Sequence, residues 1–234
     1  MKQFLFAITA LVAAMLPVRA QQLTDYTLDL KQFTQLKVGD GVNVEYIQDA
    51  ANNGKVTFSA MPDQASVLMF SNEKGKLTIN IATEGINYKN MPTVTVRSSF
   101  LEKIENAGDS TVKVSSLAAC PRFQGTVIGN GRLILHNIDA TNVDLSLKSG
   151  NGTIVATGKA QELKINMTGT GTIQADGLQA NTVSCRATGT GAIGCYPLEL
   201  LKVFGLGSTS IYYKGSPQVN NRSVGLKVNP LDAK

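Results

Sequence analysis

The residues of this 234-residue chain that come nearest to a catalytic cluster are His136, Asp139 and Asp144. Carboxylates that converge on one face of a fold can act as general acid and base on a polysaccharide. The alternative is that these residues form turns and face solvent, as Asp commonly does between strands. We favour this alternative, because the acids fall at non-equivalent positions of the repeat described below. The sequence therefore predicts no catalytic residue.

The chain also contains few residues suited to metal binding or nucleophilic catalysis. His136 is the single histidine, and no second His or Cys lies at a metal-ligand spacing from it. No serine lies in a G-x-S-x-G motif, and the Gly-x-Gly triplets lack the lysine and the helix that follow in a phosphate-binding loop. We therefore predict neither a metal site nor a cofactor.

The three cysteines, Cys120, Cys185 and Cys195, allow two interpretations. Cys185 and Cys195 are expected to point inward on the two arms of one coil, so a disulfide could join them if their Cα atoms lie within about 7 Å. The odd count and the apolar residues at equivalent places in neighbouring coils favour instead two buried thiols that fill space in the core.

Two sets of residues are candidates for binding. Tyr196, Tyr212 and Tyr213 lie near the C-terminal end, where exposed rings could stack on sugars or anchor a protein partner. The alternative for these tyrosines is that they cover the end of an apolar core. The second set lies inside Gly-x-Gly triplets and could form a polar ladder that binds a ligand or, as we favour, makes hydrogen bonds at corners. Its members are Asn130, Asn151, Thr170 and Thr190.

An internal repeat predicts the elements that position these residues. Gly-x-Gly triplets recur at a step of about 20 residues, which is typical of a solenoid. They begin at Gly129, Gly150, Gly169, Gly189 and Gly205. Glycine is expected at such corners because the chain there takes a positive φ or closely approaches its neighbour.

Apolar residues alternate with polar ones on both sides of each triplet, as at Val143, Leu145 and Leu147. A period of two indicates strands with one buried face. A leucine-rich repeat has a similar length, but its L-x-x-L-x-L motif is not sustained here. We therefore predict an all-β fold in which residues 101–217 form a single-stranded parallel β-helix.

The flanking regions lack this period. Residues 21–100 alternate as strands separated by turn signals, and we expect them to begin or cap the solenoid, because an exposed end of the stack must be covered. Residues 218–234 are expected to form a C-terminal cap or tail. Pro217 and Pro230 interrupt extended pairing there.

The N-terminus predicts export. Residues 1–20 combine Lys2, an apolar run over residues 4–16 and a small-x-small site that ends at Ala20, which is typical of a signal peptide. The run is shorter than the about 20 residues of a bilayer span, so we expect cleavage and no transmembrane segment in the mature chain. The protein would then lie in the periplasm, on the outer surface or outside the cell.

The charge does not indicate nucleic-acid binding. The full chain carries 22 basic and 17 acidic residues, a net charge of +5. Removal of Lys2 and Arg19 with the signal leaves 20 basic against 17 acidic residues, or +3. The remaining lysines are scattered, and no basic run occurs.

Several segments together resemble a bacterial family of unknown function named putative auto-transporter adhesin, head GIN domain. The resemblance runs from about Phe33 to Pro217 and rests on the order of its motifs. These are FTQLKV at 33–38, GDGVNV at 39–44, GKLTI at 75–79, the serial Gly-x-Gly triplets and IYYKGSP at 211–217. The resemblance implies a right-handed β-helix-like fold, export and occurrence in Bacteroidetes-type bacteria. The family has no established catalytic motif, so no functional residue is carried over. Leu206 departs from the polar residues of the other triplets and interrupts the ladder.

These features favour an exported, non-enzymatic β-helix protein that acts as an adhesin or as a surface- or polymer-binding module of the cell envelope. The expected partner is a glycan or a cell-surface protein. Two alternatives stay open: a carbohydrate-active enzyme on the same scaffold, and a periplasmic structural or assembly partner.

Overall fold

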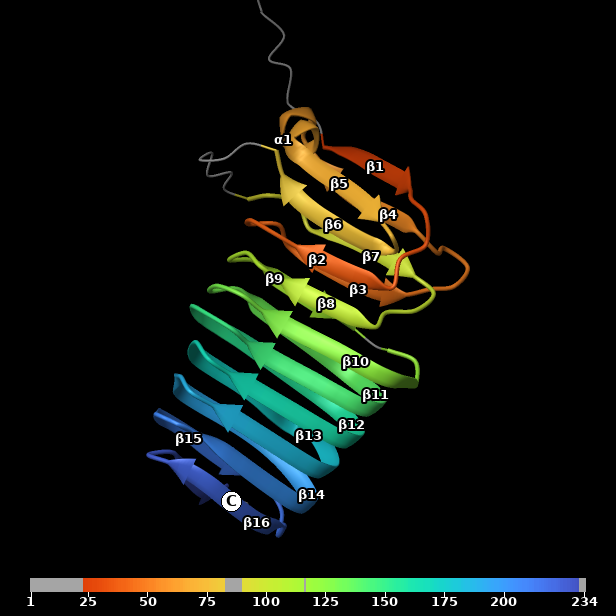
Figure 1. The fold of residues 1–234 in the computed structure, drawn as a ribbon. Coiled ribbons are helices and arrows are strands. Elements are labelled where there is room, and N and C mark those ends of the chain that lie inside the picture. The colour runs from red at the N-terminus through yellow and green to blue at the C-terminus, as the bar shows by residue number, and fades with distance from the viewer. Residues whose placement is uncertain (1–22, 83–89, 116, 232–234) are drawn as a thin grey trace, which may run out of the picture.

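Strands that stack along one axis make up almost the whole structure (Figure 1). The computed structural model describes residues 23–82, 90–115 and 117–231. These residues form a β-solenoid of about six turns, which confirms the predicted all-β solenoid. The signal peptide expected over residues 1–20 lies outside the described residues.

The regular part of the solenoid consists of long strands, each of which pairs in parallel with the next one along the chain. Apolar side chains in equivalent places stack inside, as Leu145, Ile165 and Cys185 do. This register follows the sequence period of about 20 residues. The strands are β10 (Cys120–Val127), β11 (Arg132–Leu147), β12 (Asn151–Met167), β13 (Thr170–Ala187) and β14 (Thr190–Leu206).

Two broad faces extend along the length of the solenoid. The front face, turned to the viewer in Figure 1, is defined by parallel pairing from one coil to the next. It consists of β6 (Lys76–Ile81), β2 (Gln35–Val38), β8 (Lys103–Asn106), β10, residues 142–147, 162–167, 182–187 and 200–206 of β11 to β14, and β16 (Gln218–Val224).

The back face is formed in the same way from the other arm of each coil. It consists of β7 (Val94–Ser98), β3 (Val44–Gln48), β9 (Thr111–Val114), residues 132–135, 153–156, 172–175 and 192–195, β15 (Ser208–Tyr213) and β17 (Lys227–Pro230). In the regular part, a shorter third side over residues 138–140, 158–160 and 178–180 joins the two faces.

The N-terminal region is continuous with the solenoid, but its coils are not stacked in sequence order. β2 lies between β6 and β8, and β3 lies between β7 and β9. Antiparallel strands then cover this end: β5 (Leu68–Glu73) pairs with β6, and β4 (Lys55–Ala60) pairs with both β7 and β1 (Thr24–Asp29).

A short helix in this region, α1 (Pro62–Val67), is an element that the strand pattern did not predict. Pro62 occupies a first-turn position, where its missing N–H costs no hydrogen bond. The side-chain oxygen of Gln64 accepts a bond from the Met61 amide at 3.1 Å. These local signals were present in the sequence, but they cover less than two turns.

The C-terminal end extends the stack. β16 pairs in parallel with β14, and β17 pairs in parallel with β15, so residues 218–230 form one further coil. The side chains of β16 are mostly exposed, in contrast to those of the preceding strands, and the last buried apolar residue is Ile211.

At the later corners the second glycine of the triplet has a positive φ and touches the coil before it, whereas at the two earlier corners the first glycine, Gly129 or Gly150, has the positive φ. Gly171 has φ 138° and Gly191 has φ 143°. A Cβ at Gly171 would overlap the carbonyl oxygen of Gly152, and one at Gly191 would overlap that of Gly171. Both reasons for glycine that the sequence suggested therefore hold at these corners.

Replacing Ile165 by Asp should unfold the domain. Ile165 is fully buried between Leu145 and Cys185, so the new carboxylate would lack any partner in the core. We expect a loss of at least about 4 kcal/mol in the free energy of unfolding, against about 1 kcal/mol for Ile165→Val. Urea unfolding followed by circular dichroism measures both. A midpoint close to wild type for Ile165→Asp would contradict the inward assignment.

Replacing Gly171 by Ala should loosen the stack at one corner. The strained φ costs about 2 kcal/mol, and the overlap with Gly152 adds to it. Gly41→Ala is the matched control, because nothing lies within 4 Å of a Cβ at that position. Thermal unfolding should show a clear decrease in midpoint for Gly171→Ala and almost none for Gly41→Ala. Equal midpoints would argue against close packing at the corner.

Candidate functional site

Asp139 and Asp144, the acids that came nearest to a catalytic pair, are not brought together. Two adjacent outward residues, Thr141 and Asn142, mark a corner between them. Asp139 pairs with Lys159 at 3.2 Å, on the third side of the coil. Asp144 lies on the front face and accepts two hydrogen bonds from a single arginine.

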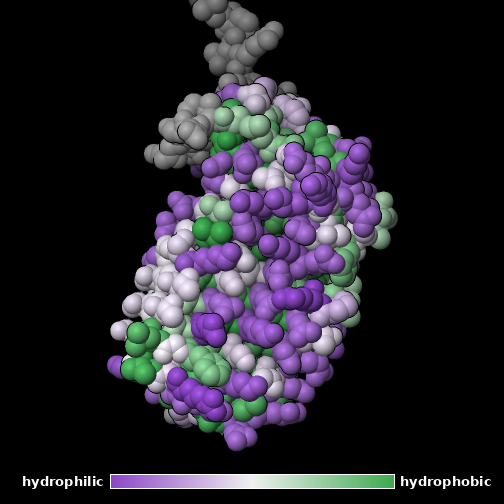
Figure 2. All heavy atoms as spheres, in the orientation of Figure 1, coloured by the Kyte–Doolittle hydropathy of each residue, from purple (hydrophilic) through white to green (hydrophobic). Residues whose placement is uncertain are grey.

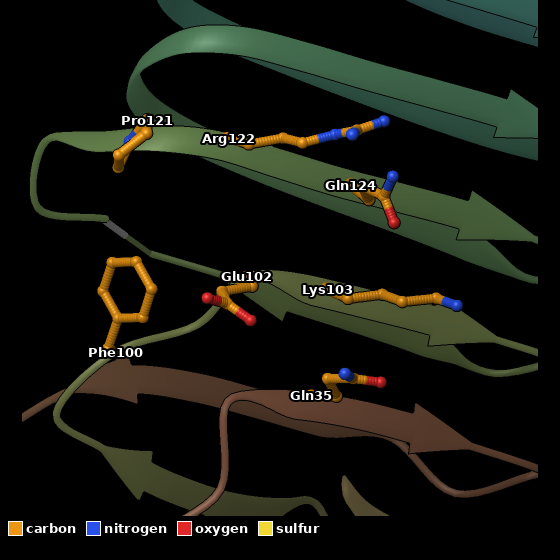
Figure 3. Close-up of a pocket in the computed structure, with 7 residues that line it drawn as sticks. All are labelled: Gln35, Phe100, Glu102, Lys103, Pro121, Arg122 and Gln124. Carbon is orange, nitrogen blue, oxygen red and sulfur yellow. The ribbon is translucent and has the colours of Figure 1, made fainter. Parts of the chain in front are cut away.

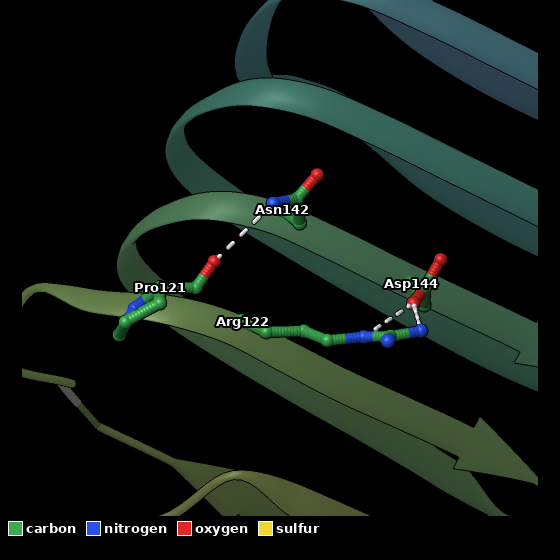
Figure 4. A network of polar contacts seen from close by, with 4 residues as sticks. All are labelled: Pro121, Arg122, Asn142 and Asp144. Atoms are coloured by element: carbon green, nitrogen blue, oxygen red, sulfur yellow. Dashed lines mark hydrogen bonds and ion pairs between the residues drawn. The ribbon is translucent and has the colours of Figure 1, made fainter.

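That arginine is Arg122 of β10, and the contact joins two neighbouring coils (Figure 4). Its Nη2 donates to Asp144 Oδ2 at 2.6 Å, and its Nε donates to the same oxygen at 3.1 Å. Asn142 donates to the Pro121 carbonyl at 3.5 Å in the same region. The guanidinium of Arg122 neutralises the charge of the Asp144 carboxylate. This arrangement suits a structural contact between coils better than a role as proton donor.

The three cysteines are buried as free thiols. A hydrogen bond with Cys195, together with burial, raises the pKa of the Cys185 thiol well above its usual range. Burial also raises the pKa of Cys120. Because the thiolate is the reactive form, Cys120 and Cys185 are poor nucleophiles in the folded protein.

The polar residues of the Gly-x-Gly triplets lie along one corner of the solenoid, between its two faces. Asn151, Thr170 and Thr190 are in register, and all three are exposed. Asn130 donates from Nδ2 to Asp109 at 3.2 Å, and its Oδ1 accepts from the Asn151 amide at 3.0 Å. The first members of the ladder thus bond successive corners to each other, while their outer surface stays accessible.

The three tyrosines lie at the other edge of the back face from this corner. Tyr212 is in register with Gly194, and 38% of its surface is exposed. Tyr213 packs against the core, and Tyr196 is half-buried. Of the residues proposed for binding, Tyr212 therefore presents the most aromatic surface. The tyrosines and the ladder do not converge on a single pocket.

A shallow pocket of about 310 Å³ lies on the front face, where β2, β8 and β10 meet (Figure 3). The side chains of Lys103 and Arg122 extend across it in the same direction, and Phe100 lies at one end. Sequence analysis missed this pocket, because its residues come from three separate coils. The lining residues are Gln35, Phe100, Glu102, Lys103, Pro121, Arg122 and Gln124.

The pocket belongs to a longer row of outward side chains. Register along the front face aligns Lys103, Gln124, Asp144, Lys164 and Ser184 on successive strands. Figure 2 shows that this face is predominantly hydrophilic. The arrangement offers an extended array of charges, amides and hydroxyls, which suits contact with a long partner better than enclosure of a small one.

The back face differs in chemistry. Its central row places the small, neutral residues Thr153, Thr172, Ala192 and Ser210 in register, between Arg132 at one end and Lys227 at the other. Charged side chains are more numerous on the front-face strands than on the back-face strands. The two faces therefore present distinct surfaces on one scaffold.

Within residues 23–82, 90–115 and 117–231, no group of three or more His, Cys, Asp or Glu side chains is placed to hold a metal ion. A helix long and apolar enough to cross a membrane is likewise not found in this part of the chain.

The order and the register of the strands define the class of β-solenoid proteins, and the comparisons agree. The chain belongs to the family named putative auto-transporter adhesin, head GIN domain, whose pattern matches residues 32–217. This confirms the resemblance drawn from the sequence motifs. The comparison with curated proteins found no match.

Solved structures of low sequence identity share the fold. A protein described as a putative adhesin from Bacteroides fragilis has a TM-score of 0.80 at 20% identity, covering 91% of this chain and 98% of its own. A putative adhesin from Parabacteroides distasonis has a TM-score of 0.73 at 19% identity, with the same coverage. A protein from the same species described as a putative lipid binding protein has a TM-score of 0.71 at 19% identity, again with this coverage.

Quantifying thiols tests the state of the cysteines. We expect three reactive thiols per chain after unfolding without reductant, and almost no rapid reaction in the native protein, because all three are buried. A native sample unfolded after treatment with reductant serves as the reference for complete reduction. Fewer than three thiols in the untreated sample would instead indicate a disulfide.

Proposed function

We propose that this protein is an exported, non-enzymatic binding module of the cell envelope, which uses the faces of its solenoid to hold an extended glycan or a cell-surface protein. The observation that carries the proposal is the continuous register of the front face from β6 to β16. Register places outward side chains in straight rows, which can contact a long partner at many points.

The distribution of reactive groups favours binding over catalysis. Asp139 and Asp144 are ion-paired on different sides of the coil, and so they do not form an acid–base pair. The front-face pocket is lined by a single carboxylate, Glu102. Glycoside hydrolysis ordinarily needs two carboxyl groups that face each other across the substrate.

Family membership also supports a binding function. The family and two of the similar structures carry an adhesin description, which is a binding role. The apolar run at residues 4–16 supports export. A third similar structure is described as a putative lipid binding protein, so lipid surfaces belong in any test of binding.

A binding screen tests the proposal. We expect the purified protein to bind saturably to at least one of a panel of polysaccharides, matrix proteins and bacterial cell surfaces, without releasing soluble products. The Ile165→Asp variant is the control for binding by unfolded chain. Absence of binding throughout the panel, or product release by the folded protein, would contradict the proposal. Capture of an internal envelope protein alone would support the assembly-partner alternative instead.

A further inference from the structure

We infer that the C-terminal half of the front face is a binding site for an acidic polysaccharide. Four cations, which we call the basic cluster, would contact its carboxylates, and Phe204 would pack against a sugar ring. The basic cluster consists of Lys164, Arg186, Lys202 and Arg222. This inference rests on the proposed binding function and assigns to it a place and a ligand class.

The register of four successive strands brings the basic cluster together. Lys164 on β12 and Lys202 on β14 lie in one row, with Ser184 of β13 between them. In the adjacent row, Arg186 and Arg222 lie on either side of Phe204. Neighbouring strands are about 4.8 Å apart, so the Cα atoms of cations in the same row are about 10 Å apart.

No described acidic residue forms an ion pair with the basic cluster. Asp144 is opposite Lys164 in the register, but it is held by Arg122. Glu162 is the only acid in the front-face segments of β12, β13, β14 and β16. These segments therefore carry four basic residues against one acidic residue.

The surroundings of the cations provide the other groups that a sugar needs. Lys164, Asn166, Ser184, Arg186 and Phe204 line a shallow pocket of about 220 Å³. The amide and the hydroxyl can bond sugar hydroxyls, and a half-buried aromatic ring offers a flat apolar surface to the C–H face of a sugar. Arginine can bind a carboxylate with two parallel hydrogen bonds.

The spacing of the cations favours a polysaccharide over a nucleic acid. Each strand of duplex DNA carries one phosphate per about 3.4 Å of helix axis, a denser array of charge than cations about 10 Å apart in a row. A polymer in which neutral, hydroxyl-bearing units separate charged ones fits this pattern. Ser184 lies between Lys164 and Lys202, and Asn166 lies beside Arg186, where such hydroxyls would be contacted.

A lipid surface fits the site less well. Hydrophobic groups do occur near the lower end of the front face in Figure 2. Leu206 and Val224, which pair at the ends of β14 and β16, are both exposed. These two side chains lie at the corner, however, beyond the rows that hold the cations. Phe204 is half-buried within the flat strand surface and cannot insert between acyl chains as an exposed side chain would.

The test uses hyaluronate, in which a uronate alternates with a neutral sugar, as the probe. We expect the wild-type protein to bind it with an affinity that falls steeply with salt, and to bind carboxyl-reduced hyaluronate at least about tenfold more weakly. The double variant Lys164→Gln, Arg186→Gln should lose about tenfold in affinity and show a shallower salt dependence. Phe204→Leu should weaken binding with an unchanged salt slope, because the ring carries no charge.

Control variants remove the same charge elsewhere. Lys148→Gln combined with Lys227→Gln alters exposed residues at a corner and on the back face, and should change affinity by less than about twofold. The thermal unfolding midpoint of each variant is measured alongside that of the wild type, so that a loss of folding is recognised. Neutral dextran, duplex DNA, and vesicles of phosphatidylglycerol and phosphatidylcholine are the competing ligands.

The outcomes separate this inference from the proposed function. Equal loss of affinity in the control variant, equal binding of carboxyl-reduced hyaluronate, or binding only to vesicles or DNA would overturn the acidic-polysaccharide site. Binding of some other surface that does not depend on the basic cluster would overturn the site while leaving the proposed function intact. Failure to bind any surface would overturn both.

Discussion

The hydrogen-bond ladder between successive coils is the constraint on which the rest of this structure depends. Each backbone segment from β10 to β14 is satisfied only by the coils before and after it, and neighbouring strands must lie about 4.8 Å apart. That separation leaves no room for a side chain where the chain turns sharply, so glycines such as Gly171 occupy the corners. It also forces residues in equivalent places to stack, whether inside as Ile165 does or outside as Lys164 does.

Stacking determines what the surface can do. Residues that are about 20 positions apart in sequence become neighbours in a row, so a charge pattern that is scattered along the chain becomes local in space. Lys164, Arg186, Lys202 and Arg222 illustrate this, because no two of them are close in sequence. The same rule keeps catalytic groups apart, since Asp139 and Asp144 occupy different places in one coil and so face different sides. A scaffold of this kind favours repeated weak contacts with a long ligand.

The ends of the stack need a different solution, because a terminal coil has no neighbour on one side. At the N-terminal end, β1, β4 and β5 pair in an antiparallel manner and cover the core. The C-terminal end instead continues in parallel through β16 and β17, whose side chains are mostly exposed. The basic cluster lies close to this end.

The sequence by itself determined the solenoid, its period, its glycine corners and its inward residues. Alternation and spacing can be read along the chain and do not depend on which strands become neighbours. Only the tertiary structure decided which coil lies beside which. It placed β2 between β6 and β8, an order that the chain direction does not predict. It also decided that Asp144 pairs with Arg122, whereas Lys164 forms no ion pair with another described residue, because such contacts depend on which strands are neighbours. The candidate binding surface is also a feature that only the tertiary structure decided.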